Sequence, residues 1–248
     1  MSHWVELAGW QVIAIGLSFV WSGFVRSGLG FGGAALSLPL LLMIYNEPLF
    51  YLPALGWHLL FFSLLTISTR MASINWRHIG RLLVLTVAPF AAGLFGLLNL
   101  PSSVLSLFVY SMTLIYGATY LLNRVLRSKS RLADAICLIG GGYVSGVSLM
   151  GAPLIAAYSA RHLPREQLRD TLFVVWMIMV IGKLSTFALA DVDLQWQFAL
   201  VALPLAGMGH WLGLKAHKML IGGNQRRFNQ IIGSGLCAVS ILGLWSVL

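Results

Sequence analysis

Two cations, Arg26 and Lys183, lie within otherwise apolar stretches of the sequence, and no Asp or Glu lies in the middle of a segment to neutralise either one. Charge inside a membrane segment is costly and usually marks a binding site or a transport path. A guanidinium can donate two parallel hydrogen bonds to the oxygens of a carboxylate, sulfite or sulfonate group. The two cations therefore predict a site for a small anion. Alternatively, Arg26 lies at a cytoplasmic helix end, and Lys183 extends its stem toward the membrane surface.

Glycine-rich stretches accompany these cations: SGLGFGGA at 27–34 and SGVSLMGA at 145–152 align at a constant offset of 118 residues, each close to a proline. Glycine costs roughly 1 kcal/mol against alanine inside a helix. A helix broken there exposes backbone N–H groups and the positive end of a half-helix, which together attract anions. With Arg26 and Lys183, the predicted substrate-binding residues are Ser27, Gly28, Gly30, Gly32, Gly33, Ser145, Gly146 and Gly151. Alternatively, the glycines and serines only allow helices to pack closely.

His58 and His210 are the histidines placed within predicted helices away from the basic clusters. Because histidine exchanges protons near neutral pH, both are candidates for proton coupling; the alternative is a packed, hydrogen-bonded side chain. The two cysteines, Cys137 and Cys237, stand alone. The sequence contains no HExxH or GxSxG motif and no carboxylate pair within an apolar segment. We therefore predict no catalytic residues, no metal site and no cofactor.

The composition is that of an integral membrane protein. Hydrophobic residues make up 58% of the 248 residues and charged residues only 9%. A membrane-spanning helix needs roughly 20 mostly apolar residues, and such runs follow one another along the whole chain. Residues 1–248 therefore form a single membrane domain of the all-α, polytopic class. The formal net charge of +9 does not indicate a nucleic-acid partner, because the charges cluster at segment ends.

Ten apolar segments are predicted to be helices or half-helices, separated by Asn, Asp, Pro or charged residues. These segments are 7–25, 34–45, 54–70, 80–98, 102–123, 133–147, 151–160, 169–190, 196–214 and 228–247.

Charge segregation predicts how these segments cross the bilayer. Fourteen of the 16 Lys and Arg residues fall in four clusters, at 70–81, 124–131, 161–169 and 215–227, whereas Glu6, Glu47, Asp191 and Asp193 lie in the intervening connections. Positive residues are retained on the cytoplasmic side. Residues 54–123 should then cross three times from outside to inside, and 169–247 three times from inside to outside, with both termini outside.

Each set of three crossings follows a Gly-broken hairpin, at 7–45 and at 133–160. The chain is thus predicted to contain two inverted-topology repeats, about 7–123 and 133–248. Such repeats with discontinuous helices are typical of secondary transporters, which hold their substrate near the midplane at the breaks.

The GLGFGGA stretch before Pro39 and the SGVSLMGAP stretch ending at Pro153 resemble the sulfite exporter TauE/SafE family, also called the toluene-sulfonate uptake permease family. The second stretch departs from the glycine-rich form that is usual in the family. The resemblance implies a multi-pass carrier of sulfite, sulfonate, sulfoacetate or related organic anions, usually in the bacterial inner membrane. It points to Gly28, Gly30, Gly32, Gly33 and Pro39 in the first stretch, and to Gly146, Gly151 and Pro153 in the second.

The expected function is therefore secondary transport of a small anion by alternating access, in contact with the lipid bilayer. An anion channel with a glycine-lined pore is the alternative. The sequence does not indicate which anion is moved, in which direction, with which coupling ion or in which oligomeric state.

Overall fold

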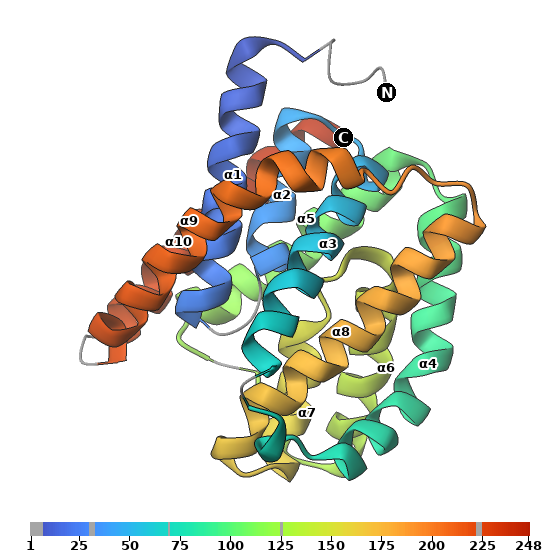
Figure 1. Ribbon diagram of the computed structural model, residues 1–248, viewed down its shortest axis with the longest axis vertical. Helices are drawn as coiled ribbons and strands as arrows, with labels where there is room; N and C mark the ends of the chain where they lie inside the picture. Colours follow the sequence, from blue (N-terminus) through green and yellow to red (C-terminus); the bar gives the residue numbers. More distant parts are fainter. Residues whose placement is uncertain (1–6, 30–32, 69, 125, 222–224) are drawn as a thin grey trace.

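A computed structural model describes residues 7–29, 33–68, 70–124, 126–221 and 225–248, which form ten α-helices and one short 3-10 helix, with no strand among these residues. The helices follow the predicted order (Figure 1). They are α1 Gly9–Leu29, α2 Gly33–Ile44, α3 Pro48–Ile67, α4 Trp76–Asn99, α5 Ser102–Leu121, α6 Arg131–Ser148, α7 Ala152–His162, α8 Arg165–Leu189, α9 Trp196–Ile221 and α10 Gln225–Val247, with the 3-10 helix at Met71–Ser73.

Six helices in the described part of the chain are long and apolar enough to cross a membrane. They belong to α3, α4, α5, α8, α9 and α10, the two sets of three that the sequence predicts. The short helix α2 has 12 residues and α7 has 11, so at about 1.5 Å per residue neither spans the hydrocarbon layer. The all-α, polytopic membrane class is therefore confirmed.

Three predicted boundaries are wrong in an informative way. Helix α1 continues to Leu29, through Arg26 and Gly28, instead of ending at 25. Helix α3 begins at Pro48 and contains Pro53, so the predicted gap before residue 54 is helical. A proline in the first turn of a helix lacks only an N–H that would have no intrahelical partner. Helix α9 extends past 214 to Ile221.

The helices pack in pairs. Helix α1 packs along α9, α6 along α4, and α5 along α10, while α3 contacts α8. Glycines permit the closest of these contacts: a Cβ added at Gly93 of α4 would lie 3.0 Å from the Cα of Gly146 of α6. On the other side of the molecule, a Cβ at Gly213 of α9 would lie 2.9 Å from the Cβ of Ser27 of α1. Close helix packing through small residues is common in membranes.

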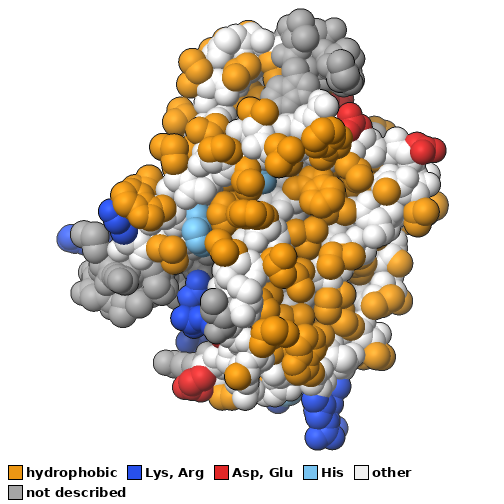
Figure 2. Space-filling model, in the orientation of Figure 1, with side chains coloured by type: hydrophobic (Ala, Val, Ile, Leu, Met, Phe, Trp, Pro, Cys, Tyr) orange, Lys and Arg blue, Asp and Glu red, His pale blue; other side chains and the backbone are white. Residues whose placement is uncertain are grey.

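The connections divide by charge as the sequence indicates. The α3–α4 and α7–α8 connections lie at the lower end in Figure 1, and the α2–α3, α4–α5 and α8–α9 connections lie toward the upper end. The lower ones adjoin the clusters at 70–81 and 161–169, whereas the upper ones carry Glu47, Asp191 and Asp193 and no Lys or Arg. Figure 2 shows hydrophobic side chains over much of one face and Lys and Arg at its lower and left edges. We call the lower end the basic end.

Candidate functional site

The first break lies between α1 and α2, and the structure places Arg26 in the last turn of α1. Arg26 is only 9% exposed. Its Nη1 donates a hydrogen bond of 2.9 Å to the backbone carbonyl of His58, which lies near the middle of α3. Because α3 is one of the six candidate spans, the guanidinium lies at the middle depth of that span and not at its end.

The guanidinium of Arg26 is incompletely satisfied. Its carbon lies 4.1 Å from the centre of the Phe62 ring, a cation–π contact worth about 0.5–2 kcal/mol. Its Nη2, however, is buried and has no hydrogen-bond partner among the described residues. No salt bridge to Arg26 is found in that part of the chain either. A charged donor left unpaired in a buried site costs several kcal/mol unless something binds it.

The second break lies between α6 and α7, and its left-handed residue is a leucine, not a glycine. Leu149 follows the last residue of α6 with φ 60° and ψ 12°, the left-handed region in which a side chain costs roughly 1–2 kcal/mol. Its backbone N–H still bonds to the carbonyl of Ser145. Gly151 then precedes α7, and Pro153 occupies the first turn of that helix, as the sequence predicts.

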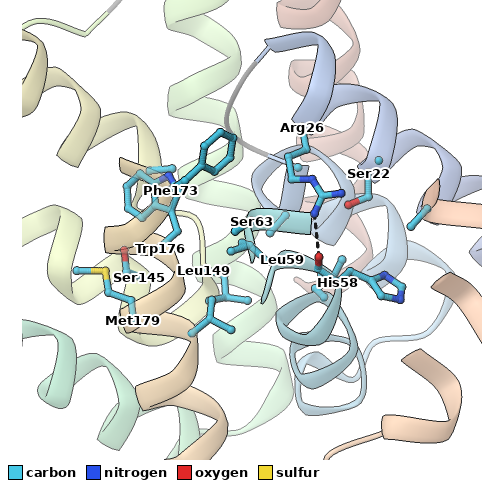
Figure 3. Close-up of a pocket in the computed structure, with 17 residues that line it drawn as sticks. Ser22, Arg26, His58, Leu59, Ser63, Ser145, Leu149, Phe173, Trp176 and Met179 are labelled. Carbon is cyan, nitrogen blue, oxygen red and sulfur yellow. Dashed lines mark hydrogen bonds between the residues drawn. The ribbon is translucent and has the colours of Figure 1, made fainter. Parts of the chain in front are cut away.

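A single cavity joins the two breaks. Arg26, Gly33 and Ala34 line it from the first break, and Ser145, Leu149 and Ala152 line it from the second. Helix α3 contributes Leu55, His58, Leu59 and Ser63, and helix α8 contributes Phe173, Trp176, Met179 and Val180. In Figure 3, Arg26, Ser22 and His58 lie on one side, Phe173, Trp176 and Ser145 lie on the other, and Leu59 and Ser63 lie between them.

The chemistry of this cavity is that of a small, positively charged site with room for a few water molecules. The space open to the centre of a water molecule is about 40 Å³, whereas one water needs roughly 10–15 Å³ on that measure. Ser63 is 1% exposed, and its Oγ has no partner among the described residues. Arg26 and Ser63 are therefore two donors with unused capacity, and the lining contains no Asp or Glu.

The two predicted histidines point elsewhere. The ring Nε2 of His58 donates to the carbonyl of Ala199 at 2.7 Å, and the ring packs edge-on to Phe19. Figure 3 shows it directed away from the cavity, so His58 lines the cavity by its backbone. His210 bonds through Nδ1 to Ser27 Oγ, and its ring lies 4.9 Å from that of Phe62. His210 and Arg26 thus contact the same Phe62 ring.

Lys183 lies near the second break but is not among the residues that line the cavity. It is 1% exposed, and its Nζ donates to the backbone carbonyl of Gly146 near the end of α6. A cation at the C-terminal end of a helix interacts favourably with the helix dipole. The structure therefore brings Lys183 to the last turn of the broken helix α6.

The predicted glycines divide into two groups. Gly33 lines the cavity, whereas Gly28 and Gly146 face the glycines of α9 and α4, and Gly151 lies against Ser145. Gly30 and Gly32 lie outside the residues that the structure describes. Ser145 lines the cavity, and Ser27 instead holds His210.

Sequence reasoning missed Ser22, Ser63, Leu59 and the wall contributed by α8. One signal was present: Trp176 of α8 lies 118 residues after His58, the same offset as the glycine stretches, and both residues line the cavity. A lone serine in an apolar helix such as α3 carries no comparable pattern.

The described residues contain no group of three or more His, Cys, Asp or Glu that could hold a metal ion. Outside the six spans, Asp134 in the first turn of α6 is the centre of a polar cluster. It accepts hydrogen bonds from Arg161 at 3.0 Å, His162 at 2.9 Å and Ser128 at 2.5 Å. Although desolvation opposes the shift, the bonds from Ser128 and His162 and the charge of Arg161 lower the pKa of Asp134.

Comparison with known proteins agrees with this architecture. No curated protein and no solved structure matches the chain. The family model described as "Sulfite exporter TauE/SafE" matches residues 15–242, which include both breaks, the cavity, five of the six candidate spans and most of the sixth. The chain therefore belongs to the sulfite exporter TauE/SafE family.

Proposed function

We propose that this protein is a secondary transporter of small sulfur-containing or organic anions, of the sulfite, sulfonate or sulfoacetate class. The anion binds in the cavity between the two breaks. The observation that carries the proposal is the buried Nη2 of Arg26, which has no partner among the described residues and lies at a cavity whose described lining contains no carboxylate. An oxyanion supplies the charge and the acceptor oxygens that this group needs.

Within this site, Arg26 is the primary ligand, Ser63 and Ser145 are neutral hydrogen-bond donors, and Gly33 lets the backbone of α2 approach the anion. The positive ends of α2 and α7 add to the field, because Gly33 and Ala152, the first residues of these helices, both line the cavity. Lys183 acts as a second cation at the broken end of α6. Ser27, Gly28, Gly146 and Gly151 support the two breaks, and His58 and His210 remain candidates for proton coupling.

We further propose that residues of about 7–123 and 133–248 are inverted repeats within one membrane domain, with both termini outside the inner membrane of a bacterium. The helix packing supports the repeats. If α1–α5 correspond in order to α6–α10, then the α1–α9 contact corresponds to the α6–α4 contact, and the α1–α2 contact corresponds to the α6–α7 contact. Helices α5 and α10 correspond to each other, as do α3 and α8, and each of these two pairs is in contact. Rocking of one repeat against the other would then alternate access to the cavity.

The direct test is transport in proteoliposomes. We expect slow, saturable uptake of sulfite or methanesulfonate that shows counterflow, and its loss in Arg26→Gln but not in Arg77→Gln, a variant with the same charge change at an exposed position. Counterflow distinguishes a carrier from a channel, because only a carrier exchanges one solute for another. Single-channel currents in the same membranes, or no transport by folded protein, would refute the carrier.

A further inference from the structure

A second and larger cavity lies toward the basic end, between α5, the connection at 126–128 and α7. The space open to water centres in it is about 460 Å³, against about 40 Å³ in the cavity at Arg26. One wall is the small, apolar face of α7, formed by Pro153, Ala156, Ala157 and Ala160. The other walls carry polar groups, among them Tyr116, Arg127 and Arg161.

Two of these polar groups are not satisfied by the protein. Tyr116 is 3% exposed, and its hydroxyl is buried without a hydrogen-bond partner in the described part of the chain. Arg127 is exposed and forms no salt bridge with any described residue. Arg161, by contrast, is paired with Asp134 at 3.0 Å. The charge of Arg161 is thereby balanced, and the unbalanced charge at this cavity is that of Arg127.

Helix packing explains why the space exists. Helix α2 packs against both α5 and α10, whereas its counterpart α7 packs on α6 and α8 in the described residues. Where the equivalent contact of α7 with α5 would lie, both helices line the cavity instead. An open volume bounded by Ala and Pro side chains, with a buried hydroxyl in its wall, leaves apolar surface and a donor without partners.

We propose that this second cavity binds an organic anion, with its charged group at Arg127 and Tyr116 and its apolar body against Ala156, Ala157 and Ala160 of α7. An arginine and a phenolic hydroxyl are both donors and suit a sulfonate or carboxylate. Because Ala152 lines the first cavity and Pro153 lines the second, the first turn of α7 is the partition between them. Binding in this cavity requires neither Arg26 nor a transport cycle, so this proposal can be tested independently of the proposed transport function.

The test uses benzenesulfonate, whose aromatic body suits the larger of the two cavities. Its dissociation constant is measured by calorimetry on the full chain in nanodiscs of phosphatidylcholine. We expect Arg127→Gln to weaken binding by at least about 10-fold and Tyr116→Phe by about 2- to 10-fold, since they remove a charged and a neutral donor. The exposed neighbour Arg124 does not line the cavity, so Arg124→Gln should leave the constant within about twofold, and so should Arg26→Gln.

Equal effects of Arg127→Gln and Arg124→Gln would overturn the proposal, because they would reveal only the general attraction of the basic end. The proposal would also be overturned if both single variants, Tyr116→Phe and Arg127→Gln, bound benzenesulfonate with an unchanged dissociation constant. Nanodiscs that contain phosphatidylglycerol separate a free anion from a lipid. A dissociation constant that is unchanged by the anionic lipid supports the free anion, and competition by the lipid would assign the cavity to a lipid headgroup instead.

Discussion

The replacement Arg26→Gln tests the central feature of the cavity. In the structure, Nη1 of Arg26 donates to the carbonyl of His58 at 2.9 Å, while Nη2 has no partner in the part of the chain that the structure describes. A bound oxyanion would accept a charge-assisted hydrogen bond from Nη2. Such a bond contributes about 1.5–3 kcal/mol net, so its loss should weaken anion binding by about 10- to 150-fold.

The same replacement should cost little stability. Removing a buried charge that has no opposite partner relieves a desolvation penalty, and so it is commonly neutral or stabilising. The cation–π contact with Phe62 offsets part of that gain, by about 0.5–2 kcal/mol. We therefore expect the melting temperature of Arg26→Gln to stay close to that of the wild type while binding is lost.

The assay is equilibrium binding of [³⁵S]sulfite to purified protein, with the melting temperature measured on the same samples. Arg77→Gln is the matched control, because Arg77 is an exposed residue at the start of α4 and lines neither cavity. Arg26→Lys keeps the charge but not the planar guanidinium. Its affinity for sulfite should lie between those of the wild type and Arg26→Gln. Sulfite affinity within about twofold of wild type in folded Arg26→Gln would refute the assignment of the anion to Arg26.

Three further changes test the rest of the structure. Ser63→Ala removes one neutral donor and should weaken sulfite binding by about 2- to 10-fold; an unchanged dissociation constant would remove Ser63 from the site. Gly93→Ala should lower the melting temperature, because its Cβ would lie 3.0 Å from the Cα of Gly146 and overpacking costs about 1–3 kcal/mol; Gly80→Ala on the same helix meets nothing within 4 Å and should not lower it. Asp134 has a lowered pKa in the folded protein, so its contribution to stability is present above its unfolded pKa of 3.8 and lost as the pH falls through the folded value. Asp134→Asn should therefore reduce the loss of melting temperature as the pH falls below 3.8, and an unchanged pH profile would contradict this reasoning.

The correspondence between sequence and structure is close where a local pattern was sufficient. Apolar run length identified the six candidate spans, because the thickness of the hydrocarbon layer fixes the number of residues a helix needs. The separation of Arg70, Arg77 and Arg81 from Asp191 and Asp193 anticipated which connections share an end of the molecule. The offset between 27–34 and 145–152 located both breaks within a few residues.

The roles of the individual residues at the two breaks could not be predicted from local sequence. A glycine in the pattern does not say whether it opens a site or admits a neighbouring helix. Gly146 faces Gly93 across the α6–α4 contact, while the left-handed residue at the second break is Leu149. No propensity scale favours a leucine in that conformation; the surrounding packing holds it there.

By itself, the sequence determined that this chain is a membrane protein of helices, with most of its cations in clusters at segment ends and two unusual cations in apolar segments. Only the tertiary structure decided that Arg26 lies at the middle depth of α3, with Nη2 unpaired among the described residues, and that Lys183 binds Gly146 outside the cavity. It also showed that Ser63 and the wall from α8 complete the cavity lining. The physical reason is that hydropathy and charge act on each segment separately along the membrane normal. The partners of a side chain, in contrast, depend on which helices pack beside it and at what rotation.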